Sequence, residues 1–83
     1  MSENLEKYKT SFIEALEISP DVVNDKLEYN SISEWDSIGH MSLISSLEES
    51  FDITFETDDI IDFSSFTKGI EILKNNYNIN ILN

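Results

Sequence analysis

The chain has no cysteine, and its five basic residues include no arginine. Without cysteine, neither a disulfide framework nor a thiolate metal site can form. Any thiol chemistry therefore needs a sulfur that a cofactor supplies. Seventeen acidic residues bring the net charge to −12. This balance argues against binding to nucleic acid or to an anionic membrane surface, because both need basic patches. It favours partner proteins with basic docking surfaces, which would be reached by electrostatic steering.

Long apolar runs are also missing. No stretch approaches the roughly 20 apolar residues of a membrane-spanning helix, and the first ten residues lack the apolar core of a signal peptide. We therefore expect a cytoplasmic protein, and a monomer. With 83 residues, 40% of them hydrophobic, the chain predicts one folded domain over 1–83 that has little room for a deep active-site cleft.

Helical periodicity is the main structural signal in the sequence. It predicts helices at about 3–17, 37–50, 57–62 and 65–77. We expect caps at Ser2, at Asp36 or Ser37, and at Thr57. The apolar residues that carry this period are Leu5, Tyr8, Phe12 and Leu16 in the first helix, Ile38, Met41, Ile44, Leu47 and Phe51 in the second, and Phe66, Ile70, Leu73 and Tyr77, which are expected to face inward, in the last.

The segment 18–36 keeps no single period and contains many turn-forming residues. A connection of this length is unusual in a compact domain, so we expect its own side chains to hold it in place. We expect a helical turn near 21–27, and some of the segment's five larger apolar residues in the core: Val22, Val23, Leu27, Ile32 and Trp35. The predicted fold is all-α, a small up-and-down four-helix bundle with three longer helices and one short one.

Ser37 stands where the second helix is expected to begin, directly after Asp36. The first turn of a helix has unpaired backbone N–H groups and a partial positive charge. A phosphate attached to a serine at this position is therefore electrostatically favoured. The simpler interpretation is that Ser37 only caps the helix, since serine is among the commonest capping residues.

The surrounding sequence resembles the phosphopantetheine attachment site of acyl carrier proteins and related carrier domains. Asp36-Ser37-Ile38 stands where that family has Asp-Ser-Leu at the head of its second helix, with Trp35 before it and Gly39-His40 after it. The likeness continues through 43–51, where Leu-Glu-Glu-Ser-Phe ends the helix, and through 58–61 and 64–66. It covers nearly the whole chain.

The resemblance implies a function for Ser37. A separate Mg²⁺-dependent transferase would attach 4′-phosphopantetheine from coenzyme A to Ser37, and the thiol of this arm would hold an acyl or aminoacyl group. Asp36 would help present the serine to the transferase. The residues implied in docking to partner enzymes are Ile38, Gly39, Met41, Glu48 and Glu49. The carrier itself would have no catalytic residue and no metal, and its partners would be the transferase and enzymes that load or transfer the acyl group.

Each of these residues also has a structural interpretation. For Met41 we favour core packing, whereas Ile38 is expected to be partly exposed. Gly39 would permit close approach of a partner or be tolerated near a helix end. Glu48 and Glu49 oppose the helix dipole, so stability does not explain them; solubility is the alternative to docking.

Fatty-acid carriers usually have acids where Gly39 and Ser42 stand, which favours a specialised pathway. An aminoacyl carrier, such as a D-alanyl carrier, is an alternative within the same class. An unmodified acidic interaction module is a different class, and a hydrolase using Ser37 and His40 is a third. We disfavour the hydrolase because no residue is evident that would orient the histidine. We expect His40 at the surface near the arm.

The acidic residues Asp58, Asp59 and Asp62 fall within the third predicted helix. Their spacing does not follow that of a calcium loop. We therefore expect a solvated face here, with loose Mg²⁺ or Ca²⁺ binding as the alternative.

Overall fold

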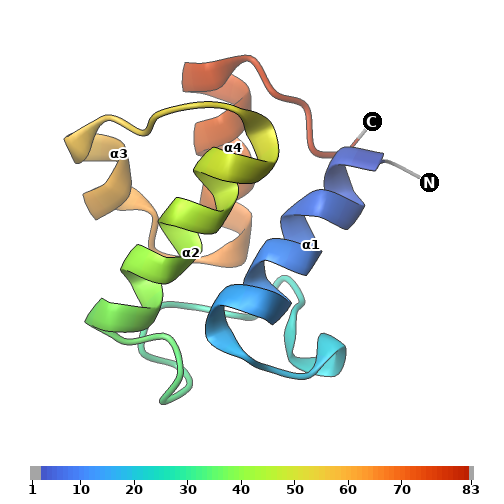
Figure 1. Cartoon of the computed structure of the whole chain (residues 1–83), viewed down its shortest axis with the longest axis vertical. Coiled ribbons are helices and arrows are strands. Elements are labelled where there is room, and N and C mark those ends of the chain that lie inside the picture. The colour runs from blue at the N-terminus through green and yellow to red at the C-terminus, as the bar shows by residue number, and fades with distance from the viewer. Residues whose placement is uncertain (1–2, 83) are drawn as a thin grey trace.

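The computed structural model describes residues 3–82, and within them the regular elements are all helices. The α-helices are α1 (Glu3–Leu16), α2 (Ser37–Phe51), α3 (Thr57–Asp62) and α4 (Phe66–Tyr77). A single turn of 3₁₀-helix, η1 (Pro20–Val22), interrupts the first connection. Figure 1 shows α1 and α2 side by side and running in opposite directions, with α4 behind them and the short α3 at one edge. The predicted all-α class is confirmed, and the predicted helix bounds are within one residue of those observed; the expected cap at Ser2 lies outside the described residues.

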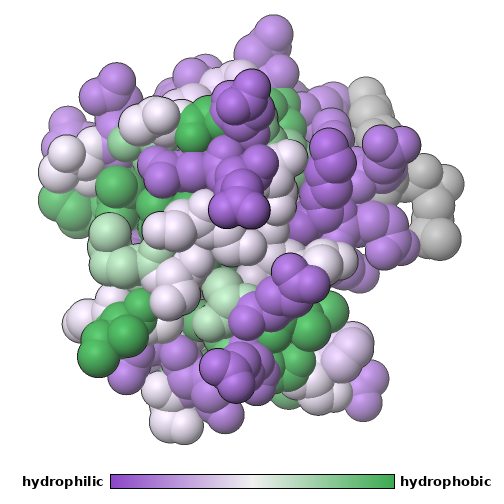
Figure 2. Space-filling view, viewed as in Figure 1, coloured by the Kyte–Doolittle hydropathy of each residue, from purple (hydrophilic) through white to green (hydrophobic). Residues whose placement is uncertain are grey.

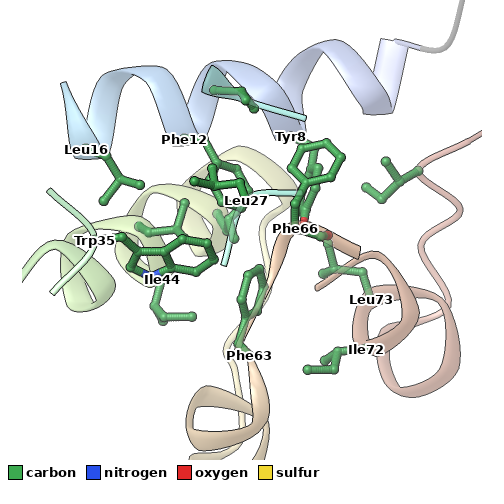
Figure 3. Packing of buried hydrophobic residues seen from close by; sticks show 14 of the residues in the cluster. Tyr8, Phe12, Leu16, Leu27, Trp35, Ile44, Phe63, Phe66, Ile72 and Leu73 are labelled. Atoms are coloured by element: carbon green, nitrogen blue, oxygen red, sulfur yellow. The ribbon is translucent and has the colours of Figure 1, made fainter. Parts of the chain in front are cut away.

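An aromatic cluster fills the centre of the bundle. The Phe12 ring lies 5.0 Å from Tyr8 and 5.4 Å from Trp35, centroid to centroid, both edge to face. Phe63 and Phe66 complete the cluster from the other side (Figure 3). All five rings are buried, and such pairs add about 0.5–1.5 kcal/mol each beyond the area they bury.

Helices α2 and α4 end on left-handed residues that are not glycine. Asp52 (φ 55°) closes α2 and Asn78 (φ 59°) closes α4, and the backbone N–H of each bonds a carbonyl of its helix. After Asn78 the tail turns back, and Ile81 is buried. Asn4 of α1 donates a hydrogen bond to the Asn80 carbonyl at 3.0 Å, which places the tail beside the start of α1.

The connection between α1 and α2 is held in place by its own side chains, as predicted. Val23, Leu27 and Trp35 are buried. An isolated antiparallel bridge joins Glu28 to Ser65. The helical turn lies at 20–22 rather than at 21–27, because Ser19 caps it and Pro20 starts it.

The inward face of α2 differs from the prediction at Met41, whereas the exposure of Ile38 was expected. The buried residues are Gly39, Leu43, Ile44 and Leu47, whereas Ile38 and Met41 are exposed. Six residues correspond to 600° of helical turn, so Ile38 points about 120° away from Ile44. The three-residue spacing that suggested one face therefore drifts around the helix.

Candidate functional site

Ser37 is the first residue of α2, and its side chain is exposed. The residue that caps this helix is Asp36, whose Oδ1 accepts the Gly39 N–H at 2.9 Å and whose carbonyl accepts the His40 N–H at 2.8 Å. The interpretation of Ser37 as the cap is therefore wrong, because Asp36 occupies that role. The Ser37 hydroxyl lies at the positive end of a 15-residue helix but does not cap it.

Gly39 is buried in the first turn of α2. A Cβ at this position would overlap the Glu34 carbonyl oxygen and lie 3.0 Å from Leu16 Cδ2. The close approach that Gly39 permits is therefore to the chain's own preceding loop. The expectation that it serves a partner is corrected, since Gly39 offers no exposed side-chain surface.

Tyr29 is the nearest side-chain partner of Ser37. Its Oη lies 3.2 Å from Ser37 Oγ, and either hydroxyl can donate the hydrogen bond. The Tyr29 ring meets Trp35 and His40 edge to face, with centroids 6.3 and 5.5 Å apart. The Tyr29 N–H donates to the Ser64 carbonyl at 2.9 Å. The phenol is therefore held beside the serine by both its backbone and its ring.

His40 is half-buried and has a defined hydrogen-bonding state. The Trp35 indole N–H donates to Nδ1 at 2.9 Å, and Nε2 lies 2.8 Å from the Ile60 carbonyl oxygen. An indole nitrogen only donates and a carbonyl only accepts, so Nδ1 carries the lone pair and Nε2 the proton. His40 is therefore only partly at the surface, and its ring is not simply solvated. Because both ring nitrogens are occupied, His40 cannot act as a base toward Ser37 in this arrangement.

A half-open cavity of about 270 Å³ lies between the first connection, α2 and α3. Three of its lining side chains are rings, and the Tyr29 ring also contacts Ser37 through its hydroxyl. The cavity therefore begins next to the candidate attachment point. It is lined by Tyr29, His40, Ile60, Ile61, Phe63 and Ser64.

The outward side of α2 forms a second surface beside Ser37, which we call the outer face of α2. Ile38 is 79% exposed and Met41 is 52% exposed. The favoured expectation that Met41 packs in the core is wrong, for the rotational reason given above. The outer face is a shallow hollow lined by Ser37, Ile38, Met41, Ser42 and Ser45. In Figure 2 the surface over α2 is mostly pale, whereas hydrophilic groups gather near its C-terminal end and over α1.

The two glutamates at the end of α2 differ. Glu49 is exposed, as a docking residue must be. Glu48 is half-buried, and its Oε2 accepts the Phe55 N–H at 2.8 Å, so this carboxylate holds the connection to α3 against α2. No structural reason for Glu48 was evident from the sequence, and this hydrogen bond supplies one.

The acidic residues of α3 are not simply a solvated face. Asp59 accepts hydrogen bonds from the Tyr77 hydroxyl at 2.7 Å and from Asn76 Nδ2 at 2.8 Å. Burial and the hydrogen bond to Asp59 both raise the pKa of Tyr77. Over residues 3–82, no group of three or more histidine, cysteine or acidic side chains is arranged to hold a metal ion. In the same part of the chain, no helix is long and apolar enough to cross a membrane.

Sequence reasoning missed Tyr29 as a site residue. It lies in the connection without a period, eight residues before Ser37, and no local pattern links the two. Comparison with known proteins adds no identification, since no family model, curated protein or solved structure matches the chain.

Proposed function

We propose that the chain is a carrier protein whose Ser37 is esterified with 4′-phosphopantetheine and holds an acyl or aminoacyl group as a thioester. The observation that carries the proposal is the Ser37 hydroxyl, exposed at the N-terminus of α2 and left out of the cap by Asp36. The attachment motif Asp36-Ser37-Ile38 lies at the head of a helix, as the resemblance to carrier proteins requires.

The attachment step needs only one nucleophile from this chain. Ser37 Oγ attacks the phosphorus of coenzyme A that bears the pantetheine, and the bond from that phosphorus to the adenosine bisphosphate breaks. The transferase takes the serine proton, and its Mg²⁺ stabilises the charge that develops on the phosphate oxygens. The phosphodiester that forms lies at the positive end of α2, which favours its negative charge.

The outer face of α2 is the surface proposed for docking to partner enzymes. Ile38 and Met41 provide exposed apolar area directly after the attachment residue, and Glu49 provides charge at the far end. Basic patches on partners would be steered to the chain by its net charge of −12. Gly39 and Glu48 are left out of this surface, because they pack within the chain.

An unmodified acidic interaction module is the main alternative. It accounts for the charge and the helices, but it gives no role to Ser37, an exposed serine at the start of α2 that does not cap the helix. A Ser37–His40 hydrolase is disfavoured by the hydrogen bonds that occupy both nitrogens of His40.

Mass spectrometry of the intact protein tests the proposal. Incubation with a promiscuous phosphopantetheinyl transferase, Mg²⁺ and coenzyme A should add one phosphopantetheinyl group to each chain. Ser37→Ala should abolish the gain, whereas Ser42→Ala, a matched change at an exposed serine of the same hollow, should load normally. An unchanged mass of the wild-type protein would contradict the carrier function.

A further inference from the structure

We infer that Tyr29 positions the group carried on Ser37 by donating a hydrogen bond from its phenol to the phosphodiester. The inference rests on the proposed function and adds a residue that the attachment motif does not contain. Its starting point is the 3.2 Å separation of Tyr29 Oη and Ser37 Oγ.

Esterification decides the direction of this hydrogen bond. In the unmodified chain either hydroxyl can donate to the other. Once Ser37 Oγ is bonded to phosphorus it has no hydrogen, and the two unesterified phosphate oxygens only accept. The phenol O–H is then the donor, and a small rotation brings it from the ester oxygen to a charged phosphate oxygen. A hydrogen bond to an ionised acceptor is shorter and about twice as strong as a neutral one.

Tyr29 is already organised for this role before any group is attached. Its backbone N–H bonds the Ser64 carbonyl, and the neighbouring Glu28 forms the bridge to Ser65. Its ring stands against Trp35, which is fully buried, and against His40. The hydroxyl therefore needs little further ordering to hold a phosphate, which lowers the entropic cost of the contact.

The charge around the site makes a neutral donor useful. The sequence from 27 to 67 contains no lysine or arginine, and Asp36 carries a negative charge next to Ser37. A phosphate on Ser37 would therefore rely on neutral donors, among them the first-turn N–H groups of α2 that Asp36 does not bind and the Tyr29 phenol. Because Tyr29 also lines the cavity of about 270 Å³, a phosphodiester held by its hydroxyl places the start of the arm at the mouth of that cavity.

The test compares Tyr29→Phe with Tyr77→Phe in the full chain. Both changes remove one phenol oxygen, but the Tyr77 hydroxyl bonds Asp59 rather than Ser37. After loading with coenzyme A, the ³¹P resonance of the phosphodiester should move in Tyr29→Phe and stay at its wild-type position in Tyr77→Phe. The rate of loading by the transferase at limiting carrier should fall about threefold to tenfold in Tyr29→Phe only.

A second measurement needs no folded Tyr29 variant. In wild-type protein labelled at the tyrosine Cζ, the Tyr29 resonance should move on loading, while those of Tyr8 and Tyr77 stay in place. The Tyr29 resonance is identified as the one that persists in both Tyr8→Phe and Tyr77→Phe. The role of Tyr29 alone would be overturned if loading left this resonance in place and the ³¹P resonance of loaded Tyr29→Phe stayed at its wild-type position. Failure of the wild-type chain to gain mass would overturn both that role and the carrier function.

Discussion

Both sides of α2 carry apolar side chains, but the surroundings of the two sides are opposite. On the inner side, Leu43 and Leu47 are fully buried against α1 and the aromatic cluster. On the outer face, Ile38 and Met41 have no comparable packing and lie beside Ser37. The inner side accounts for the fold. The outer face exposes apolar side chains that the fold does not use, and it is the surface that we propose for docking.

The sharpest test of this difference truncates one residue on each side. Leu47→Ala should lower the free energy of unfolding by about 2–5 kcal/mol, because it leaves a cavity in the core. Met41→Ala should change it by no more than about 0.5 kcal/mol. Urea denaturation followed by far-UV circular dichroism measures both. Equal losses would show that the two sides are not distinct.

Gly39 tests how tightly the inner side is packed. Gly39→Ala should destabilise the protein by about 1–3 kcal/mol, because the added methyl group meets the Glu34 carbonyl oxygen, which belongs to the backbone and cannot rotate away. Ser42→Ala, at an exposed position of the same helix, should stabilise the protein by about 0.5 kcal/mol, because alanine has a higher helix propensity than serine. Thermal unfolding compares the two, and a more stable Gly39→Ala would contradict the packing described here.

The histidine between the two sides provides the next effect in size. His40→Phe keeps a ring in place but removes the acceptor of the Trp35 indole N–H and the donor to the Ile60 carbonyl. It should cost about 1–2 kcal/mol, and the emission of Trp35 should shift. Ser45→Ala on the outer face is the control. Unchanged stability and emission in His40→Phe would show that these hydrogen bonds contribute nothing.

The smallest expected effect is a loss of folding stability at alkaline pH, caused by the buried Tyr8. Burial raises the pKa of Tyr8, so the folded chain holds the phenol proton more strongly than the unfolded chain does. This stabilisation is complete below the ordinary tyrosine value of about 10 and is lost as the pH rises above it. Urea midpoints measured from pH 8 to pH 11 should fall above about pH 10.

Tyr8→Phe serves as the control for this pH effect. It removes the hydrogen bond to the Phe66 carbonyl, so it should be less stable at neutral pH, and its midpoint should depend less on pH. Part of the dependence of the urea midpoint on pH should remain in Tyr8→Phe, because the pKa of Tyr77 is also raised. A slope as steep as that of the wild type would place the titrating group elsewhere.

Much of the fold follows from the sequence because the period and the caps of a helix involve residues that are close together in the chain. The bounds of α3 match the prediction, but its cap position is held by Glu56 rather than by Thr57, which is already helical. Helix α4 begins one residue later than predicted because Ser65 is its cap. The rotation of α2 was mispredicted at Met41, whereas Ile38 is exposed as expected. Spacing alone does not choose between two apolar stripes when packing against α1 makes that choice.

The candidate site was predictable only in part. Ser37 and Asp36 could be found because capping and the attachment motif are written in consecutive residues. Tyr29, the bonded state of His40 and the role of Glu48 all depend on contacts between segments that are distant in sequence. Periodicity does not report such contacts, since each forms only after the bundle has packed.

Trp35, the only tryptophan of the chain, gives the molecule a built-in optical sensor. Its indole is sealed from water, yet it lies two positions from Ser37 and touches both Tyr29 and His40. A group attached to Ser37 as proposed would meet Tyr29, which contacts this fluorophore. We therefore expect the attachment to change the emission of Trp35, so that it could be followed in real time without a dye or a tag.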